Sequence, residues 1–287
     1  MIELRDGSCQ ALVATDGGEL RGWSADDADL IWPGDPAWWE RSAPVLFPIV
    51  GWARDGMIRV DGTPRPMGVH GFAAARRFTV AEREAASCRL ELTDDAETRA
   101  VYPFAFSLTI DYRLSRGGLA IDFLVTNRGD RPMPYALGFH PGFRWPLAGG
   151  TREGHGVVFA GEEVASVPVI APGGLFSDRR RPLPLQDRHL ALDDALFAAE
   201  ALCFLDAHSR SWSFVAPDGA RLTMAVEGFP HLALWSKPGA PFLCMEAWTG
   251  YGDPVGFDGE LKDKPSMRLL APGAADRARV TLAFRRG

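Results

Sequence analysis

The fold of this chain is decided by the stretch from Phe106 to Val125, which reads FSLTIDYRLSRGGLAIDFLV. Polar and apolar residues alternate from Ser107 to Leu114, and they largely alternate again from Leu119 to Val125. A period of two is typical of strands that bury one face, and the intervening Ser115-Arg116-Gly117-Gly118 has the composition of a turn. The stretch therefore predicts a β-hairpin.

Strand-like runs recur along the whole chain, whereas helical patterns are scarce. The helical candidates are two short segments, Asp194 to Ala201 and Asp94 to Ala100, and the second of these can equally be a turn. The 31 Gly and 22 Pro favour many short elements joined by turns. The pattern predicts an all-β fold, either a sandwich or a barrel. Further strands are expected at Ala11 to Val13, Phe78 to Ala81, Cys88 to Thr93, Gly156 to Phe159, Trp212 to Ala216, Leu222 to Val226, Leu232 to Trp235, Phe242 to Trp248 and Arg279 to Phe284.

Nothing in the sequence divides the chain into separate domains. It has no composition shift, no linker and no internal repeat, so we expect a single domain over residues 1–287. The Pro-rich segment from Pro168 to Pro184, which contains Arg179-Arg180-Arg181, is the nearest approach to a break. We expect this segment to be a long surface loop rather than a hinge.

The composition bounds the class of partner. With 46% hydrophobic and 24% charged residues, the chain has ample material for a packed core. The formal net charge of -6 argues against a nucleic-acid or anionic-membrane surface, because both need an excess of basic residues. We therefore expect a small-molecule partner, and the sequence makes no prediction about the oligomeric state.

The location is predicted from the N-terminus and the cysteines. The first residues have neither the long apolar region nor the small-residue cleavage site of a secretory signal, and no stretch approaches the ~18 apolar residues of a membrane helix. The four cysteines stand far apart without a C-x-x-C pair, as expected for reduced core thiols. These features predict a cytoplasmic protein.

Two residues are the main candidates for acid-base chemistry. His140 lies in Gly138-Phe139-His140-Pro141-Gly142-Phe143, whose glycines and proline predict a bend that displays the imidazole, and this suits a general acid. Glu246 interrupts the apolar run from Phe242 to Trp248, where desolvation raises the pKa of a carboxylate and suits a general base. The alternatives are a histidine that caps a turn and a glutamate on an exposed or ion-paired strand face.

Other side chains are candidates for binding. His70 precedes Gly71, which allows a ligand or another backbone to come close. Arg41 leads directly into an apolar run, so its guanidinium needs either a carboxylate partner or the hydroxyls of a ligand. Trp145 stands near prolines and glycines in a probable loop, where an exposed ring can stack on a sugar; Trp32, Trp38 and Trp39 share this setting.

The sequence carries no metal, phosphate or nucleophile motif. It has no H-E-x-x-H, no Walker A loop, no G-x-S-x-G and no dinucleotide fingerprint between a strand and a helix. Two histidines and one glutamate can in principle hold a metal, but their spacing gives no support, so no metal or cofactor is predicted. The remaining histidines, His155, His189, His208 and His231, are expected at the surface.

Five motifs in order resemble the aldose 1-epimerase (galactose mutarotase-like) family, and especially its bacterial LacX-like branch. They cover most of the chain. The motifs are Arg41 with the following Ser-Ala-Pro-Val-Leu-Phe-Pro-Ile-Val-Gly, His70-Gly71-Phe72, Tyr102-Pro103-Phe104, Gly138-Phe139-His140-Pro141-Gly142-Phe143 and Cys244-Met245-Glu246-Ala247-Trp248.

The resemblance implies a large antiparallel β-sandwich and a cofactor-independent isomerase. The family's general base matches Glu246, which takes the proton of the anomeric hydroxyl, and its general acid matches His140, which protonates the ring oxygen. His70 matches a histidine near the ring oxygen, and Arg41 matches an arginine that holds sugar hydroxyls. Ring opening, rotation and closure on the other face then interconvert the α and β anomers.

The chain also departs from the family pattern. Galactose-specific members carry a sugar-binding aspartate, for which Asp194 is the best match, although Asp194 equally suits a helix N-cap. Ala247 stands where the branch often has proline. The sugar is therefore open, and a hexose-6-phosphate 1-epimerase, with Arg179-Arg180-Arg181 on the phosphate, and a non-catalytic sugar-binding protein are the alternatives.

Overall fold

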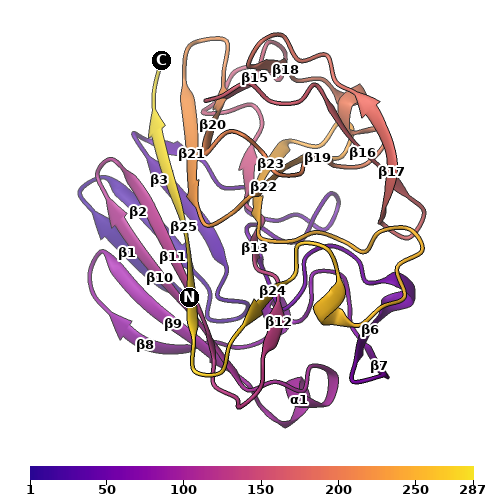
Figure 1. Cartoon of the computed structure of the whole chain (residues 1–287). Coiled ribbons are helices and arrows are strands. Elements are labelled where there is room, and N and C mark those ends of the chain that lie inside the picture. The colour runs from indigo at the N-terminus through magenta and orange to yellow at the C-terminus, as the bar shows by residue number, and fades with distance from the viewer.

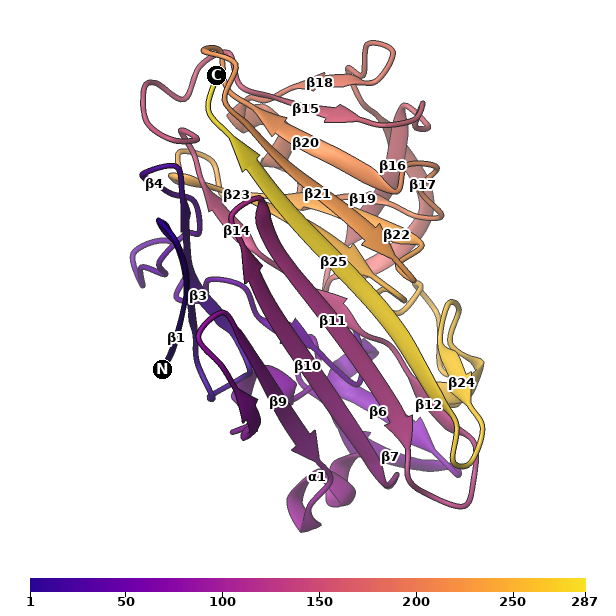
Figure 2. The same cartoon turned by 90° about the vertical axis from the view of Figure 1, so that its left-hand side faces the viewer.

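The computed structural model describes every residue from Met1 to Gly287, and its largest sheet has nine antiparallel strands. Their order is β18-β15-β20-β21-β25-β11-β10-β9-β8, and Figure 2 shows β25 crossing the middle of this sheet. The strands are β8 (Thr79–Arg83), β9 (Ser87–Thr93), β10 (Phe106–Ser115), β11 (Gly118–Asn127), β15 (Gly156–Phe159), β18 (His189–Ala191), β20 (Ser211–Val215), β21 (Arg221–Glu227) and β25 (Ala275–Arg285).

A six-stranded sheet packs against the inner face of the nine-stranded sheet (Figure 1). Its order is β19-β22-β23-β13-β5, with β14 also paired to β23. The rings of Phe123 on β11 and Phe139 on β13 lie 5.8 Å apart, so the two sheets meet directly. The strands are β5 (Val45–Leu46), β13 (Gly138–Phe139), β14 (Gly142–Arg144), β19 (Leu202–Phe204), β22 (His231–Trp235) and β23 (Phe242–Trp248).

Smaller elements surround these two sheets. A four-stranded sheet is formed by β1 (Ile2–Asp6), β2 (Cys9–Val13), β3 (Leu20–Ala25) and β4 (Ala28–Asp29). Three strand pairs are formed by β6 (Met57–Val60) with β7 (Thr63–Pro66), β12 (Met133–Tyr135) with β24 (Arg268–Leu270), and β16 (Ser166–Ala171) with β17 (Leu175–Pro182). The helical elements are α1 (Ala96–Val101) and the 3-10 turns η1 (Arg54–Gly56), η2 (Ala73–Ala75), η3 (Asp194–Phe197) and η4 (Leu261–Asp263).

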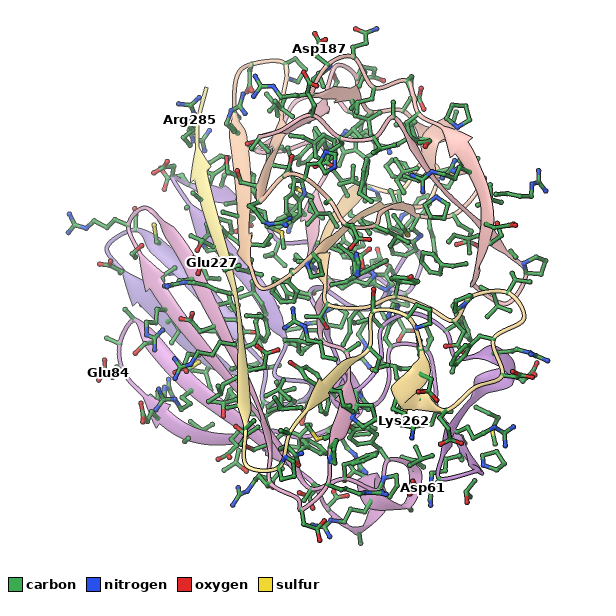
Figure 3. The ribbon with its side chains drawn as sticks, in the orientation of Figure 1. Asp61, Glu84, Asp187, Glu227, Lys262 and Arg285 are labelled. Carbon is green, nitrogen blue, oxygen red and sulfur yellow. The ribbon has the colours of Figure 1, made fainter.

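The predicted hairpin and the all-β class are confirmed. Strands β10 and β11 pair from Phe106 with Asn127 to Ser115 with Gly118. The apolar residues of the alternating pattern are buried, and together with residues of both sheets they form one core of 72 residues. Charged side chains such as Glu84, Asp187 and Arg285 lie at the periphery (Figure 3). Strand alternation thus gives the hairpin one apolar face that packs into the core, as a sandwich requires.

Two local expectations are corrected. The segment from Pro168 to Pro184 is mainly the β16–β17 hairpin rather than a loop, since the two strands pair from Ser166 with Pro182 to Ala171 with Leu175, and Phe176 is buried. Its register shifts between Pro168 and Ile170, where proline has no N–H for the ladder. The helix expected from Asp194 to Ala201 is only the single turn η3. The helical alternative for the other candidate, Asp94 to Ala100, is confirmed as α1. Asp95 caps this helix by accepting a hydrogen bond from the backbone N–H of Thr98.

The chain has no helix with the length and apolar character needed to cross a membrane.

Candidate active site

The outer face of the six-stranded sheet carries Glu246. In β23 the side chains of Met245 and Ala247 enter the main core, so the alternation of the strand turns Glu246 and Trp248 to the opposite face. Glu246 is nevertheless only 1% exposed. Its Oε2 accepts a hydrogen bond of 3.0 Å from the indole N–H of Trp248. The sequence therefore places a desolvated carboxylate on this face, as predicted.

Strand register brings His140 opposite Glu246. Both β13 and β14 pair with β23, Gly138 opposite Trp248 and Gly142 opposite Cys244. The bend between β13 and β14 therefore sets His140 across from Glu246. The Nε2 of His140 lies 3.3 Å from the Oε2 of Glu246. The two residues expected to act as acid and base thus touch, although about a hundred residues separate them in the sequence.

Burial shifts the two pKa values in opposite directions. Desolvation raises the pKa of Glu246 well above its usual value, and the hydrogen bond from Trp248 only partly opposes this. Desolvation, followed by the nearby His70, lowers the pKa of His140 well below its usual value. The pair therefore favours one proton on the glutamate and an uncharged imidazole. Such a pair titrates as one unit and offers a proton and a lone pair side by side.

Aromatic rings enclose His140. The ring of Trp39 stacks on the imidazole with centroids 4.9 Å apart, and Trp235 meets it edge-on at 5.7 Å. Trp39 reaches this position because Gly142 has no side chain, since a Cβ there would lie 2.9 Å from the indole of Trp39. Trp39 is half-buried, so the stack borders solvent. These contacts restrict the imidazole to the orientation that faces Glu246.

His70 also lies beside His140, as the two imidazoles meet edge-to-face with centroids 5.7 Å apart. The backbone N–H of Gly51 donates to Nδ1 of His70 over 3.1 Å. Because Nδ1 accepts, the neutral ring carries its proton on Nε2. Burial, followed by the positive charge of Lys264, lowers the pKa of His70 to about 4. His70 is thus a neutral hydrogen-bond donor near neutral pH.

Arg41 lies against the segment that follows His70. Its Nη1 donates to the carbonyl of Ala74 over 3.1 Å and lies 3.6 Å from Oε2 of Glu19. Glu19 is 2% exposed, and its other oxygen accepts the backbone N–H groups of Ser42 and Ala43. Glu19 therefore fixes both the guanidinium and the chain beside it. Sequence reasoning missed Glu19, because nothing around Gly17-Gly18-Glu19 signals a buried carboxylate.

The structure corrects the expectation for Trp145. This ring is only 2% exposed and packs among core aromatics, while the guanidinium of Arg152 covers it at 4.0 Å from the centroid. It therefore has no free face for a sugar. Asp194 belongs to the same group, because it forms an ion pair of 2.8 Å with Arg152. A hydrogen bond from the backbone of Gly239, followed by that from Arg152, lowers the pKa of Asp194.

Two other histidines are buried rather than at the surface as expected. His155 is 2% exposed, and its Nε2 accepts the backbone N–H of Leu147. His231 is 1% exposed, and its Nδ1 accepts the backbone N–H of Asp206. Local sequence does not reveal such backbone partners. No group of three or more His, Cys, Asp or Glu side chains is arranged to hold a metal ion.

Comparison with known proteins assigns the whole chain to a family. The family model for aldose 1-epimerase matches residues 1–282. The chain belongs to the aldose 1-epimerase family. The plasmid and chromosomal forms of the protein LacX from Lactococcus lactis subsp. lactis are each 31% identical to it over 283 residues, which cover 94% of this chain and 95% of LacX.

Solved structures agree with this membership. A galactose mutarotase-like protein from Lactobacillus casei superposes with a TM-score of 0.93 at 26% identity, covering 99% of this chain and 100% of that protein. A galactose mutarotase related enzyme from Lactobacillus acidophilus gives a TM-score of 0.90 at 28% identity, covering 99% and 97%. The resemblance seen in the sequence is thus confirmed, and aldose 1-epimerase family members share this sandwich.

Proposed function

We propose that this protein is an aldose 1-epimerase that interconverts the α and β anomers of an aldose by acid-base catalysed ring opening and closure. The observation that carries the proposal is the contact of 3.3 Å between His140 and Glu246. Anomer exchange needs one group that accepts the proton of the anomeric hydroxyl and one that delivers a proton to the ring oxygen. A histidine and a glutamate in contact provide both groups.

In the proposed reaction, Glu246 accepts the hydroxyl proton of C1 while the Nε2 of His140 protonates the ring oxygen. The C1–O5 bond breaks and C1 becomes an aldehyde. Rotation about the C1–C2 bond and attack by the C5 hydroxyl on the other face close the ring, and both protons return. The reaction has no net change in protons or electrons, so the acid and the base are regenerated at the end of each turnover.

The reactive state differs from the resting state by the position of one proton. The shifts of the two pKa values favour a protonated Glu246 and a neutral His140, whereas ring opening starts from a carboxylate and an imidazolium. The contact between Oε2 and Nε2 allows the proton to pass directly between them. In this proposal the Nε2–H of His70 donates to the substrate near the ring oxygen, and Arg41 binds sugar hydroxyls.

Two alternatives receive less support. A hexose-6-phosphate 1-epimerase needs free cations for the phosphate, yet Arg180 donates to Ser166, and Arg181 donates to the carbonyls of Leu196 and Glu200. Only Arg179 of the triplet is left exposed without such a bond. A non-catalytic sugar-binding protein has no need of a contacting acid-base pair.

The test is anomer-resolved proton NMR of freshly dissolved α-D-glucose and α-D-galactose, with and without the protein. We expect the α signal to decay faster with the protein and at the buffer rate with Glu246→Gln. Glucose 6-phosphate is the comparison for the phosphate alternative. If no aldose or sugar phosphate equilibrates faster than in buffer while titration still shows sugar binding, the sugar-binding alternative replaces this proposal.

We also propose that residues 1–287 form one domain in the cytoplasm, with a sugar as the partner. One apolar core contains residues from Ile2 to Phe284, which supports a single domain. The cysteines are free and buried, which fits a reducing compartment; they are Cys9, Cys88, Cys203 and Cys244.

A further inference from the structure

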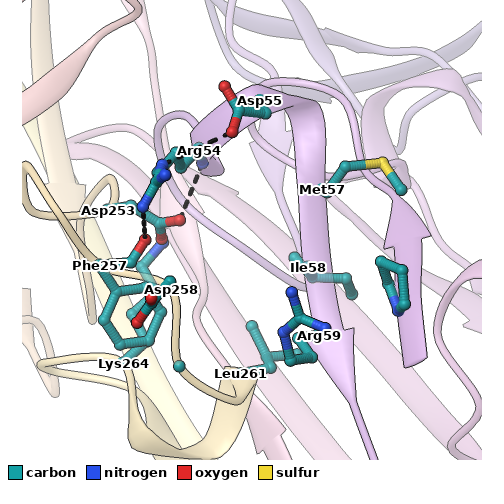
Figure 4. A pocket seen from close by; sticks show the side chains of 12 residues that line it. Arg54, Asp55, Met57, Ile58, Arg59, Asp253, Phe257, Asp258, Leu261 and Lys264 are labelled. Atoms are coloured by element: carbon teal, nitrogen blue, oxygen red, sulfur yellow. Dashed lines mark hydrogen bonds and ion pairs between the residues drawn. The ribbon is translucent and has the colours of Figure 1, made fainter. Parts of the chain in front are cut away.

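A buried ion pair lies outside the residues assigned above. The ammonium of Lys264 is 2.9 Å from Oδ1 of Asp253, and the two residues are 4% and 5% exposed. Both residues line a cavity of about 200 Å³, where Figure 4 shows Asp253 beside Arg54. A buried pair is costly to desolvate, so the contacts that its two members make deserve a closer description.

The pair is bonded to the loop from Gly51 to Arg54. The second carboxylate oxygen of Asp253 accepts the backbone N–H of Arg54 over 2.8 Å, as the dashed line in Figure 4 marks. The backbone N–H of Asp253 donates to the carbonyl of Trp52, also over 2.8 Å. Asp253 therefore holds this loop at two points, and Lys264 holds the carboxylate that does so.

The same loop holds His70 at two points. The N–H of Gly51 donates to Nδ1 of the imidazole, and the carbonyl of Gly51 accepts the backbone N–H of His70 over 2.9 Å. His70 has a φ of 64°, which a residue with a side chain adopts at a cost. The backbone of Gly51 therefore has to be fixed if His70 is to keep this conformation and a single tautomer.

We propose that Asp253 and Lys264 are positioning residues for His70. The ion pair fixes the loop whose Gly51 N–H occupies Nδ1, and the ammonium opposes a second proton on the imidazole. His70 then remains a neutral donor through Nε2 while His140 and Glu246 exchange protons. The inference deepens the role of His70 and rests on the proposed function.

The charged and titratable groups around His70 have opposite effects on its protonation. Lys264, which follows η4, disfavours the imidazolium, and burial disfavours it more strongly. Asp253, in the loop after β23, favours a cation in its vicinity and so partly offsets Lys264. His140, in the bend between β13 and β14, is neutral in the resting state and is charged only while it holds the proton that Glu246 has passed to it. Removing the ammonium is therefore expected to raise the pKa of His70 without restoring its ordinary value.

The first experiment uses the wild-type protein and does not depend on turnover. Two-dimensional NMR of the ring nitrogens, with ¹⁵N-labelled histidine, reports the tautomer and the titration midpoint of His70. We expect a neutral ring between pH 6 and pH 8 with the proton on Nε2 alone. A proton on Nδ1, or a mixture of tautomers, would overturn the inference whether or not the protein is an epimerase.

The second experiment compares Lys264→Met with Lys262→Met, which removes the same charge from an exposed position on η4. We expect the midpoint of His70 to rise by roughly 0.5 pH unit or more in Lys264→Met alone. Asp253→Asn is expected to introduce the Nδ1–H tautomer, because it loosens the loop. Thermal unfolding checks that Lys264→Met and Asp253→Asn fold. If both fold and His70 keeps the wild-type midpoint and tautomer in each of them, the inference is wrong.

Discussion

The Nε2 of His140 and the Oε2 of Glu246 lie 3.3 Å apart, and the two residues are only 7% and 1% exposed. Neither group can be charged there without its partner, since an isolated buried charge is far more costly than a pair. Burial thus links the two protonation states, and a single shared proton serves both residues. This coupling is what allows one site to supply an acid and a base together.

Glu246→Gln is expected to lower the rate of anomer exchange by ~100-fold or more, because the amide cannot accept the hydroxyl proton. His140→Asn is expected to cause a similar loss. Polarimetry measures the rate, and thermal unfolding checks that the fold is retained. The matched control is Glu227→Gln, an exposed glutamate on β21 that Figure 3 labels, which is expected to keep the wild-type rate. Wild-type rates in both site variants would refute the assignment of acid and base.

The pH dependence of kcat/KM follows from the opposite pKa shifts. The pKa of Glu246 is raised and that of His140 is lowered, so the pair keeps one proton across the ordinary titration range of histidine. We expect no change in kcat/KM with a midpoint near pH 6.5. Activity should fall only in acid, where the pair gains a second proton, and in alkali, where it loses its last one. A histidine-like step near pH 6.5 would contradict the shared proton.

Trp39→Ala is expected to lower kcat by roughly 10-fold, because His140 loses the ring that fixes its orientation. Trp39→Phe keeps a stacking face and should recover most of this loss. Single-turnover kinetics with saturating sugar separates kcat from binding. An equal loss in the two variants would show that the indole acts through some feature other than the stack on His140.

Glu19→Gln is expected to raise KM by several-fold with a smaller change in kcat, because it releases Arg41 without touching the acid-base pair. The amide can still accept one backbone N–H, so the variant is expected to fold. Asp16→Asn, an exposed carboxylate nearby in the sequence, is the control. Should kcat fall and KM stay constant, Glu19 would act on the chemistry rather than on Arg41.

The buried His231 is expected to make the folded protein less stable in acid. Burial lowers its pKa to about 4. With an ordinary value near 6.5, the unfolded chain binds more protons than the folded protein between these two pH values. Stability is therefore fully present above pH 6.5 and falls as the pH drops toward 4, by about 2 kcal/mol from this residue between pH 7 and pH 5.

Urea unfolding at pH 7 and pH 5 checks this expectation. His231→Gln keeps a polar group for Asp206 and Ser266 but cannot titrate, so its stability should fall less on acidification. The same pH dependence in the variant and the wild type would show that other groups control the acid sensitivity.

Much of the fold could be predicted because strand alternation is a local property. The period of two between Phe106 and Val125 specified both the hairpin and its buried face. The sequence around Phe176 predicts a loop, because its apolar residues are interrupted by prolines and arginines. Only the pairing of β16 with β17 shows that these residues form strands. The prolines and glycines near Trp145 indicate a loop, but they do not indicate whether its ring faces solvent or, as the structure shows, an arginine.

By itself, the sequence determined the β-rich class, the motifs of the family and the residue types of the acid and the base. Alternation, turn composition and residue chemistry are encoded in neighbouring positions, so they can be read without long-range contacts. The tertiary structure alone decided that His140 touches Glu246, that Gly51 fixes the tautomer of His70, and that Glu19 and the pair Asp253–Lys264 lie behind the site. These relationships join residues that lie from 11 to 106 positions apart in the chain, and they follow from strand register and burial, which arise only when the sheets pack.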